Sequence, residues 1–172
     1  MYAHYESIDT QPALRFERRI THPVAAVWSA ITQPSELEAW FPTEVAGEMR
    51  PGGHLSFSFE EHDLPPMEGE VTEFEPPRTL AFWWGEDHLR FELAPAEGGA
   101  ETDLRFTVLL GTEDKAARDG AGWHVCLDSL QEALDGADST AIHGVNSPWR
   151  EHYEEYERRG FPASAPIPGV DS

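Results

Sequence analysis

The stretch that decides the fold is Thr112 to Gly136, TEDKAARDGAGWHVCLDSLQEALDG. Small and apolar residues recur there at steps of three and four, which places them in one stripe on a helix: Ala116, Gly120, Trp123, Leu127, Leu130 and Leu134. Thr112 suits an N-cap with two acidic residues after it, and Gly136 stands where a C′ glycine ends a helix. We therefore expect one long amphipathic helix from Thr112 to Gly136.

Two glycines, Gly120 and Gly122, interrupt this helix beside Trp123. Each costs about 1 kcal/mol relative to alanine in a helix interior. Such a cost indicates either a close approach of another part of the chain or a gap against the facing surface, and a gap is a place for a ligand. The alternative is a helix that starts only at Gly122, after a loop.

The residues before this helix alternate between apolar and polar in short segments separated by turn residues. We expect strands over residues 13–20, 43–48, 54–59, 69–75, 79–84, 88–93 and 102–109. Between the first two of them, Pro23 and Pro34 favour the starts of two short helices, over 24–32 and 34–39. The pattern predicts an α+β fold, in which the long helix covers the dry face of an antiparallel sheet.

The chain length of 172 residues suits one domain with a core of its own. We expect an N-terminal tail at residues 1–12, the domain at 13–136, and a C-terminal extension at 137–172. Within that extension, residues 149–159 (WREHYEEYERR) predict a charged helix that docks Trp149, Tyr153 and Tyr156 on one side. Such a helix could seal the mouth of a pocket, support a dimer or pad the sheet, and we favour the last. The residues from Phe161 onward contain several prolines, and we expect them to be extended and frayed.

The composition excludes several classes of partner. Lys and Arg number 12 against 32 Asp and Glu, which gives a formal net charge of -20 and repels phosphate backbones and anionic membranes. We expect no nucleic-acid partner, no membrane insertion, and a monomer or weak homodimer. No basic leader with an apolar run is present, so a cytoplasmic location is expected. Cys126 is the single cysteine, and its apolar neighbours predict a buried, inert thiol.

Several stretches resemble one protein family. They are RFERRITHPVAAVWSAITQPSELEAWFP (15–42), MRPGGHLSF (49–57), EGEVTEFEPPRTLAFWW (68–84) and GWHVCLDSL (122–130). They are similar to landmarks of the bacterial homologues of the activator of heat-shock protein 90 ATPase, within the START and birch-pollen-allergen-like (SRPBCC) superfamily. The resemblance covers Leu14 to Leu134. It implies a helix-grip fold, in which a curved seven-stranded antiparallel sheet wraps around the C-terminal helix and leaves a cavity between them.

Bulky aromatic residues converge on the same interior. The chain has six tryptophans and nine phenylalanines, more than a thin two-layer core needs. A pocket suited to a largely apolar small molecule is predicted from Trp40, Phe57, Phe59, Trp84, Phe91, Trp123 and Leu127. The alternative is that these side chains simply fill the core.

The eight histidines do not form a metal-binding spacing. No His-x-x-x-His pair occurs on a helix and no second cysteine exists, so we predict no metal and no cofactor. The cluster Glu60-Glu61-His62-Asp63 is interpreted as a solvated loop. No catalytic residue is predicted either: no Gly-x-Ser-x-Gly stretch occurs, and His124 and Cys126, two apart on a helix, point away from each other.

Polar residues on the strands offer the remaining candidates. The alternation places His88, Arg90 and Glu92 on the face opposite Phe91, hence outward. Arg18 shares the parity of the apolar residues of its strand, so it is drawn inward, where it could pair with a carboxylate or anchor an acidic ligand. The alternative is an arginine in water or in a structural ion pair at the sheet edge.

Three functions are compatible with these observations. We favour a protein that binds a lipid or an aromatic metabolite, because aromatic density is high and no coherent catalytic set is present. An enzyme of the cyclase or aromatase kind, acting on a polyketide-type substrate, would need His88, Arg90 or His124 close together inside the cavity. A module that regulates a chaperone ATPase is the third possibility, which the family resemblance implies.

Overall fold

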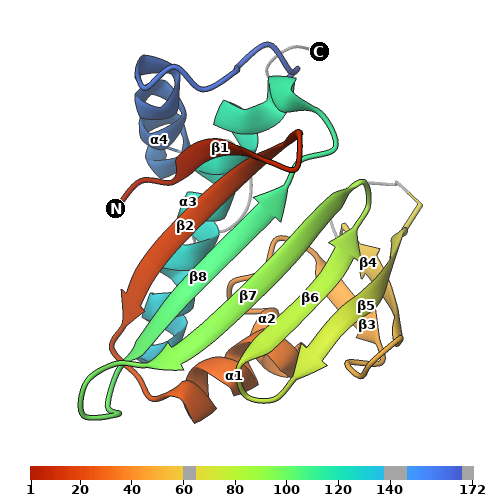
Figure 1. The fold of residues 1–172 in the computed structure, drawn as a ribbon, viewed down its shortest axis with the longest axis vertical. Helices are drawn as coiled ribbons and strands as arrows, with labels where there is room; N and C mark the ends of the chain where they lie inside the picture. The colour runs from red at the N-terminus through yellow and green to blue at the C-terminus, as the bar shows by residue number, and fades with distance from the viewer. Residues whose placement is uncertain (60–64, 138–146, 168–172) are drawn as a thin grey trace.

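A computed structural model of the protein describes residues 1–59, 65–137 and 147–167. Eight strands form one antiparallel sheet in the order β1-β2-β8-β7-β6-β5-β4-β3, and helix α3 lies along one face of that sheet (Figure 1). The strands are β1 (His4–Ile8), β2 (Gln11–Ile20), β3 (Glu44–Gly47), β4 (His54–Ser58), β5 (Met67–Glu75), β6 (Thr79–Trp84), β7 (Asp87–Pro95) and β8 (Thr102–Leu109). The helices are α1 (Val24–Thr32), α2 (Pro34–Leu37), the 3₁₀ turn η1 (Glu113–Lys115), α3 (Ala116–Leu134) and α4 (Ser147–Arg158). This confirms the predicted helix-grip fold.

The strand count differs from the expected seven because residues His4–Ile8, expected as tail, form β1. A tight turn at Asp9 and Thr10, both with positive φ (49° and 69°), leads directly into β2. Positive φ at both central residues is the geometry of a two-residue hairpin, which aspartate tolerates and which usually selects glycine at the second position. Because this turn lacks glycine, the sequence does not carry the usual signal of a two-residue hairpin.

The sheet has one dry face and one wet face, as the alternation predicted. In β7 the odd-numbered residues from Asp87 to Leu93 are buried, and in β8 the even-numbered residues from Thr102 to Val108 are buried. The first and last strands of the predicted set lie side by side, with Phe16 of β2 opposite Phe106 of β8. Their inward side chains, with those of β4 and β6, form the core against α3.

Helix α3 does not begin as predicted. The side chain of Thr112 makes no capping hydrogen bond, and η1 separates it from the first residue of α3, Ala116. Lys115, the last residue of η1, is buried and contacts Asp87 of β7. The 3₁₀ turn thus places its ammonium group against the sheet. The alternative start at Gly122 is also wrong. At the other end Gly136 has a φ of 81° and ends the helix as predicted.

The glycines of α3 allow close approach of another helix. A Cβ atom added at Gly120 would lie 3.4 Å from the ring of Tyr156, and one at Gly122 would lie 3.9 Å from Nε1 of Trp149. Both aromatic residues are on α4, which packs against α3 rather than padding the sheet as expected (Figure 1). Of the two explanations for the glycines, close approach is the one observed.

The described part of the C-terminal tail is extended but not frayed, in contrast to our expectation. Phe161 and Ala165 are buried. The backbone N–H of Ala117 donates to the carbonyl of Pro162, and that of Ala165 donates to the carbonyl of Asp114. The tail therefore satisfies one backbone N–H in the first turn of α3, which a side-chain cap would otherwise serve, and one carbonyl of η1.

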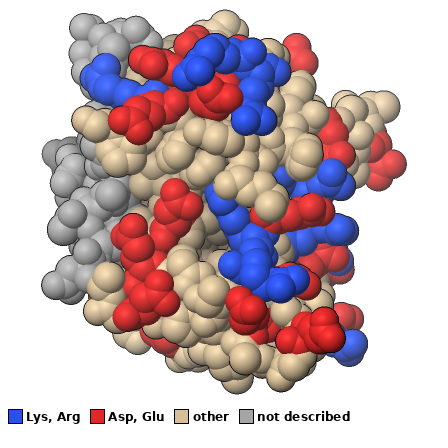
Figure 2. All heavy atoms as spheres, turned by 90° about the vertical axis from the view of Figure 1, so that its left-hand side faces the viewer, with Lys and Arg blue, Asp and Glu red and all other residues tan. Residues whose placement is uncertain are grey.

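Charges of both signs share the side of the molecule that carries α4 and the β1–β2 edge. Figure 2 shows basic side chains next to acidic ones on that side, so the excess of acid does not form a uniform field there. Within the described residues, the chain has no helix that is both long and apolar enough to cross a membrane.

Candidate functional site in the aromatic interior

The aromatic side chains between the sheet and α3 form one connected cluster around Phe41. Its ring centroid lies 5.6 Å from that of Trp123, 6.2 Å from that of Phe57 and 6.2 Å from that of Trp84. Phe41 follows α2, at the place where the chain passes from the two short helices to β3. The helical corner after β2 therefore inserts an aromatic residue between the sheet and α3.

Six of the seven predicted site residues belong to the core cluster or pack against it, and Phe59 directly follows β4. Five of them are buried: Trp40, Phe57, Phe91, Trp123 and Leu127. Phe59 and Trp84 are only half-buried. The prediction missed three buried members of the same cluster, namely Phe41, Phe82 and Phe106. The strand parity of the last two was a sufficient signal, since each follows an inward-facing residue at a step of two.

The half-buried aromatics mark one end of the cluster. Strands β4 and β6 both pair with β5 in the antiparallel sense, so they run in the same direction and finish toward the same end of the sheet. Trp84 is the last residue of β6 and Phe59 directly follows β4. The indole Nε1 of Trp84 donates to Oγ1 of Thr43 at 3.4 Å, and its ring meets that of Trp123 at 5.2 Å. The aromatic cluster is therefore most exposed to solvent at this end, where Trp84 and Phe59 lie.

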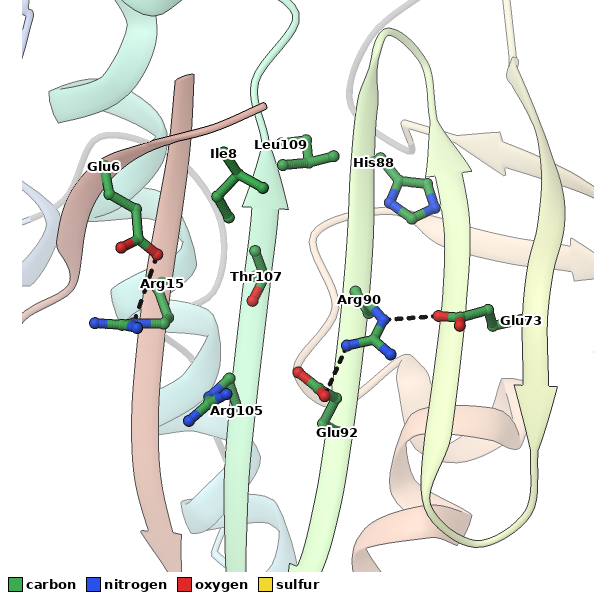
Figure 3. A pocket seen from close by; sticks show the side chains of 10 residues that line it. All are labelled: Glu6, Ile8, Arg15, Glu73, His88, Arg90, Glu92, Arg105, Thr107 and Leu109. Atoms are coloured by element: carbon green, nitrogen blue, oxygen red, sulfur yellow. Dashed lines mark hydrogen bonds and ion pairs between the residues drawn. The ribbon is translucent and has the colours of Figure 1, made fainter. Parts of the chain in front are cut away.

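A separate hollow of about 420 Å³ lies on the opposite, outer face of the sheet. It is lined by Glu6, Ile8, Arg15, Glu73, His88, Arg90, Glu92, Arg105, Thr107 and Leu109 (Figure 3). Arg90 pairs with Glu73 and with Glu92, at 2.7 Å each. The outward orientation predicted for His88, Arg90 and Glu92 is thus confirmed, and this charged, internally paired surface does not suit an apolar ligand.

Arg18 is turned toward α3, as its parity predicted. Its side chain is 13% exposed, and Nη2 lies 4.0 Å from Oδ1 of Asp128 on α3. The pairing with a carboxylate, one of the predicted alternatives, is therefore observed.

His124 is buried on the side of α3 that faces α4. Its Nδ1 lies 2.9 Å from the hydroxyl of Tyr156, and burial, with a smaller contribution from Arg18, lowers its pKa to about 2. His88 and Arg90 line the outer hollow instead, so the grouping that a cyclase would need does not form from these three. Cys126 is buried, and burial raises its pKa to about 12, as expected for an inert thiol. The cluster Glu60–Asp63 lies outside the described residues.

Comparison with known proteins was made at three levels. The family model described as Activator of Hsp90 ATPase homolog 1-like protein matches residues 21–135. A search of curated proteins found no match. Among solved structures, CalU16 from Micromonospora echinospora has a TM-score of 0.69 at 26% identity, over 91% of this chain and 94% of that chain.

Two further structures are similar over most of their length. The conserved protein of unknown function EF2215 from Enterococcus faecalis has a TM-score of 0.74 at 19% identity, covering 91% of this chain and 89% of that one. The protein encoded by BPP1335 from Bordetella parapertussis has a TM-score of 0.61 at 26% identity, covering 91% and 90%. EF2215, at its low identity, supports the fold alone.

Proposed function

Since this chain belongs to the Activator of Hsp90 ATPase homolog 1-like family, whose fold is generally a ligand-binding one, we propose that it binds a hydrophobic small molecule between its sheet and α3. The ligand class is a lipid or an aromatic metabolite. The proposal includes a cytoplasmic location and a binding role without catalysis. It takes the ligand contacts from the seven predicted residues, chiefly from Trp84, Phe59 and Trp123 at the half-buried end of the cluster.

The observation that carries the proposal is the half-buried end of the aromatic cluster. Aromatic rings that belong only to a core are normally covered on all sides, whereas an indole that ends a strand on the interior face and is still partly exposed offers a stacking surface. Trp84 is in this position, and Thr43 beside it supplies a hydroxyl that can orient a polar group of the ligand. The rest of the cluster is in mutual ring contact, so the ligand belongs at this end.

The experiment that tests the proposal starts from the full-length protein as purified. Small molecules released by denaturation are identified by mass spectrometry, and binding of the identified compound, or of an anilinonaphthalene sulfonate dye as a general apolar probe, is followed by fluorescence. We expect an apolar compound at a defined stoichiometry, and dye binding that the compound displaces. A protein that releases no compound and binds no dye would contradict the proposal.

Two adjacent tryptophans provide a matched pair of variants. Trp84→Ala removes the interior indole at the end of β6, while Trp83→Ala removes an indole that is 39% exposed on the other face of the same strand. Loss of one stacked aromatic contact of about 1 kcal/mol weakens binding about fivefold. We expect this loss in Trp84→Ala only. Equal effects of both substitutions would place the ligand elsewhere.

The rival functions give different results in the same experiments. A cyclase-like enzyme would convert the released compound or a polyketide-type analogue, which product analysis detects. A chaperone regulator would retain a chaperone from the host lysate and alter its ATPase rate, with no need for Trp84.

A further inference from the structure

A group of two imidazoles and one carboxylate lies between α3 and α4, apart from the aromatic interior. His124 and Asp128 occupy positions one turn apart on α3, and His152 comes from α4. Oδ2 of Asp128 lies 3.8 Å from Nε2 of His124 and 3.9 Å from Nε2 of His152. One ligand atom from each residue can be chosen so that all three lie within 4.8 Å of one another.

Two tyrosines hold the other nitrogens of these imidazoles. The hydroxyl of Tyr156 lies 2.9 Å from Nδ1 of His124, and the hydroxyl of Tyr2 lies 3.2 Å from Nδ1 of His152. Coordination through Nε2 requires the tautomer in which Nδ1–H donates to the tyrosine oxygen, because that tautomer leaves a free lone pair on Nε2. Outer partners of this kind orient the histidines of protein metal sites and fix their tautomer.

The carboxylate is held from one side and open on the other. Nη2 of Arg18 lies 4.0 Å from Oδ1 of Asp128, a long ion pair without a hydrogen bond, and Oδ2 is the oxygen nearer the histidines. The side chain of Asp128 is 51% exposed, so solvent reaches the group. The positive charge of Arg18 disfavours hard cations, which bind mainly to the negative charge of carboxylates. Imidazole coordination is then the main attraction for a metal ion at this group.

We propose that His124, Asp128 and His152 bind a divalent first-row transition metal ion, with Zn²⁺ as the natural probe and solvent completing the coordination. Two ligands that are each about 2.1 Å from one ion can be at most about 4.2 Å apart. Both Nε2–Oδ2 distances are shorter than that, and the three ligand atoms together lie within 4.8 Å, so a small closure of the group brings all of them into range. Two histidines, one carboxylate and an open position are also the ligand set of zinc sites that keep an exchangeable water. This inference is independent of the proposed apolar ligand.

Binding requires one adjustment of the described arrangement. The two imidazole rings are stacked, with centroids 3.8 Å apart and planes inclined by 22°, so their lone pairs do not yet converge. The side chain of His152 is 19% exposed against 5% for His124, and it is the ring with room to turn.

The test uses the full chain, freed of any affinity tag, with ZnCl₂ in calorimetry and CoCl₂ in visible absorption spectroscopy. We expect about one ion per chain, and Co²⁺ bands typical of nitrogen and oxygen coordination. Loss of an outer partner of a metal ligand typically costs 10- to 100-fold in affinity. Asp128→Asn and His152→Asn, which remove ligands, should therefore weaken binding by more than about 100-fold, and Tyr2→Phe by about 10-fold.

A second histidine–aspartate pair supplies the control. His22 and Asp135 lie 2.7 Å apart on the surface, and among the residues that the structure describes no third ligand forms a metal-binding group with them. Asp135→Asn should bind Zn²⁺ as the unaltered protein does. Absence of Zn²⁺ and Co²⁺ binding would overturn the proposal, as would equal affinities of Asp128→Asn and Asp135→Asn.

If a variant fails to fold, nuclear magnetic resonance of the histidine nitrogens tests the proposal on the unaltered protein instead. In the unaltered protein, Zn²⁺ should shift Nε2 of His124 and His152 and remove the mutual ring-current shifts of the stack. Shifts confined to other histidines would overturn the proposal in the same way.

Discussion

The buried ammonium group of Lys115 allows a quantitative prediction. Lys115 is the single lysine of the chain, and its side chain is 8% exposed. Nζ lies 2.7 Å from Asp87, whose side chain is 3% exposed, and 2.7 Å from the exposed Glu86. Lys115→Met leaves the carboxylate of Asp87 buried without its cation, a loss that costs about 3–5 kcal/mol for a buried pair. Because Glu86 remains in solvent, we expect a value near the lower end, about 3 kcal/mol.

A double-mutant cycle separates the ion pair from the packing of the lysine stem. Asp87→Asn keeps an oxygen that accepts the backbone N–H of Gly111, now 2.8 Å from Oδ1, and removes the charge. The double variant Lys115→Met with Asp87→Asn should therefore recover about 1–3 kcal/mol relative to the sum of the single changes. The free energy of unfolding is measured by urea denaturation with tryptophan fluorescence, at constant m.

An exposed ion pair serves as the control for this cycle. Arg105 and Glu17 lie 3.4 Å apart with side chains 53% and 44% exposed, so Arg105→Gln should change stability by less than about 0.5 kcal/mol. A loss below about 1 kcal/mol in Lys115→Met, or no recovery in the double variant, would refute the reasoning.

The same ion pair gives a pH dependence with a definite sign. Burial alone would lower the pKa of Lys115, but its hydrogen bonds to Asp87 and Glu86 raise the pKa above the usual 10.5. A lysine pKa that is higher in the folded state adds stability below pH 10.5, and that stability is lost as the pH rises through the folded value. Lys115→Met should therefore flatten the fall in stability at alkaline pH, as urea midpoints above pH 10 would show.

Three smaller predictions concern single positions. Gly120→Ala should be neutral or slightly stabilising, whereas Gly120→Val should cost about 1–3 kcal/mol by forcing the ring of Tyr156 away; equal urea midpoints for the two variants would contradict this. Thr10→Gly should stabilise the protein by about 1 kcal/mol, since Thr10 has a φ of 69°, and a lower melting temperature would show the turn to be unstrained. Cys126 should resist a thiol reagent at pH 8 until urea unfolds the chain, and rapid labelling of the native protein would be inconsistent with its burial.

The parts of the fold that follow from local pattern were predictable. The alternation of Leu89, Phe91 and Leu93 gives the dry face of β7 directly, and Pro23 and Pro34 place the two short helices. The same alternation predicted that the strand residues Phe57 and Phe91 face the interior. These features depend on apolar residues spaced two, three or four positions apart, and such spacing can be read directly from the sequence.

Features that depend on distant partners could not be read in this way. β1 has no buried residue and pairs only at the sheet edge, so its sequence shows no clear alternation. The glycines of α3 fit the aromatic residues of α4, a helix beyond the segment of family resemblance. The spacing of His124 and Asp128 was visible, but His152 joins them only through the packing of α4 on α3.

The adjacency of β2 and β8 has a consequence for synthesis of the chain on the ribosome. β2 is among the first segments to emerge, yet its partner β8 follows only after five further strands, and Tyr156 arrives later still to accept the backbone N–H of Ala3. β2 can pair with β1 at once, but the nascent chain must carry the other edge of β2 unpaired until β8 has emerged. Such late closure between distant segments slows folding and leaves a period in which a growing chain is open to aggregation.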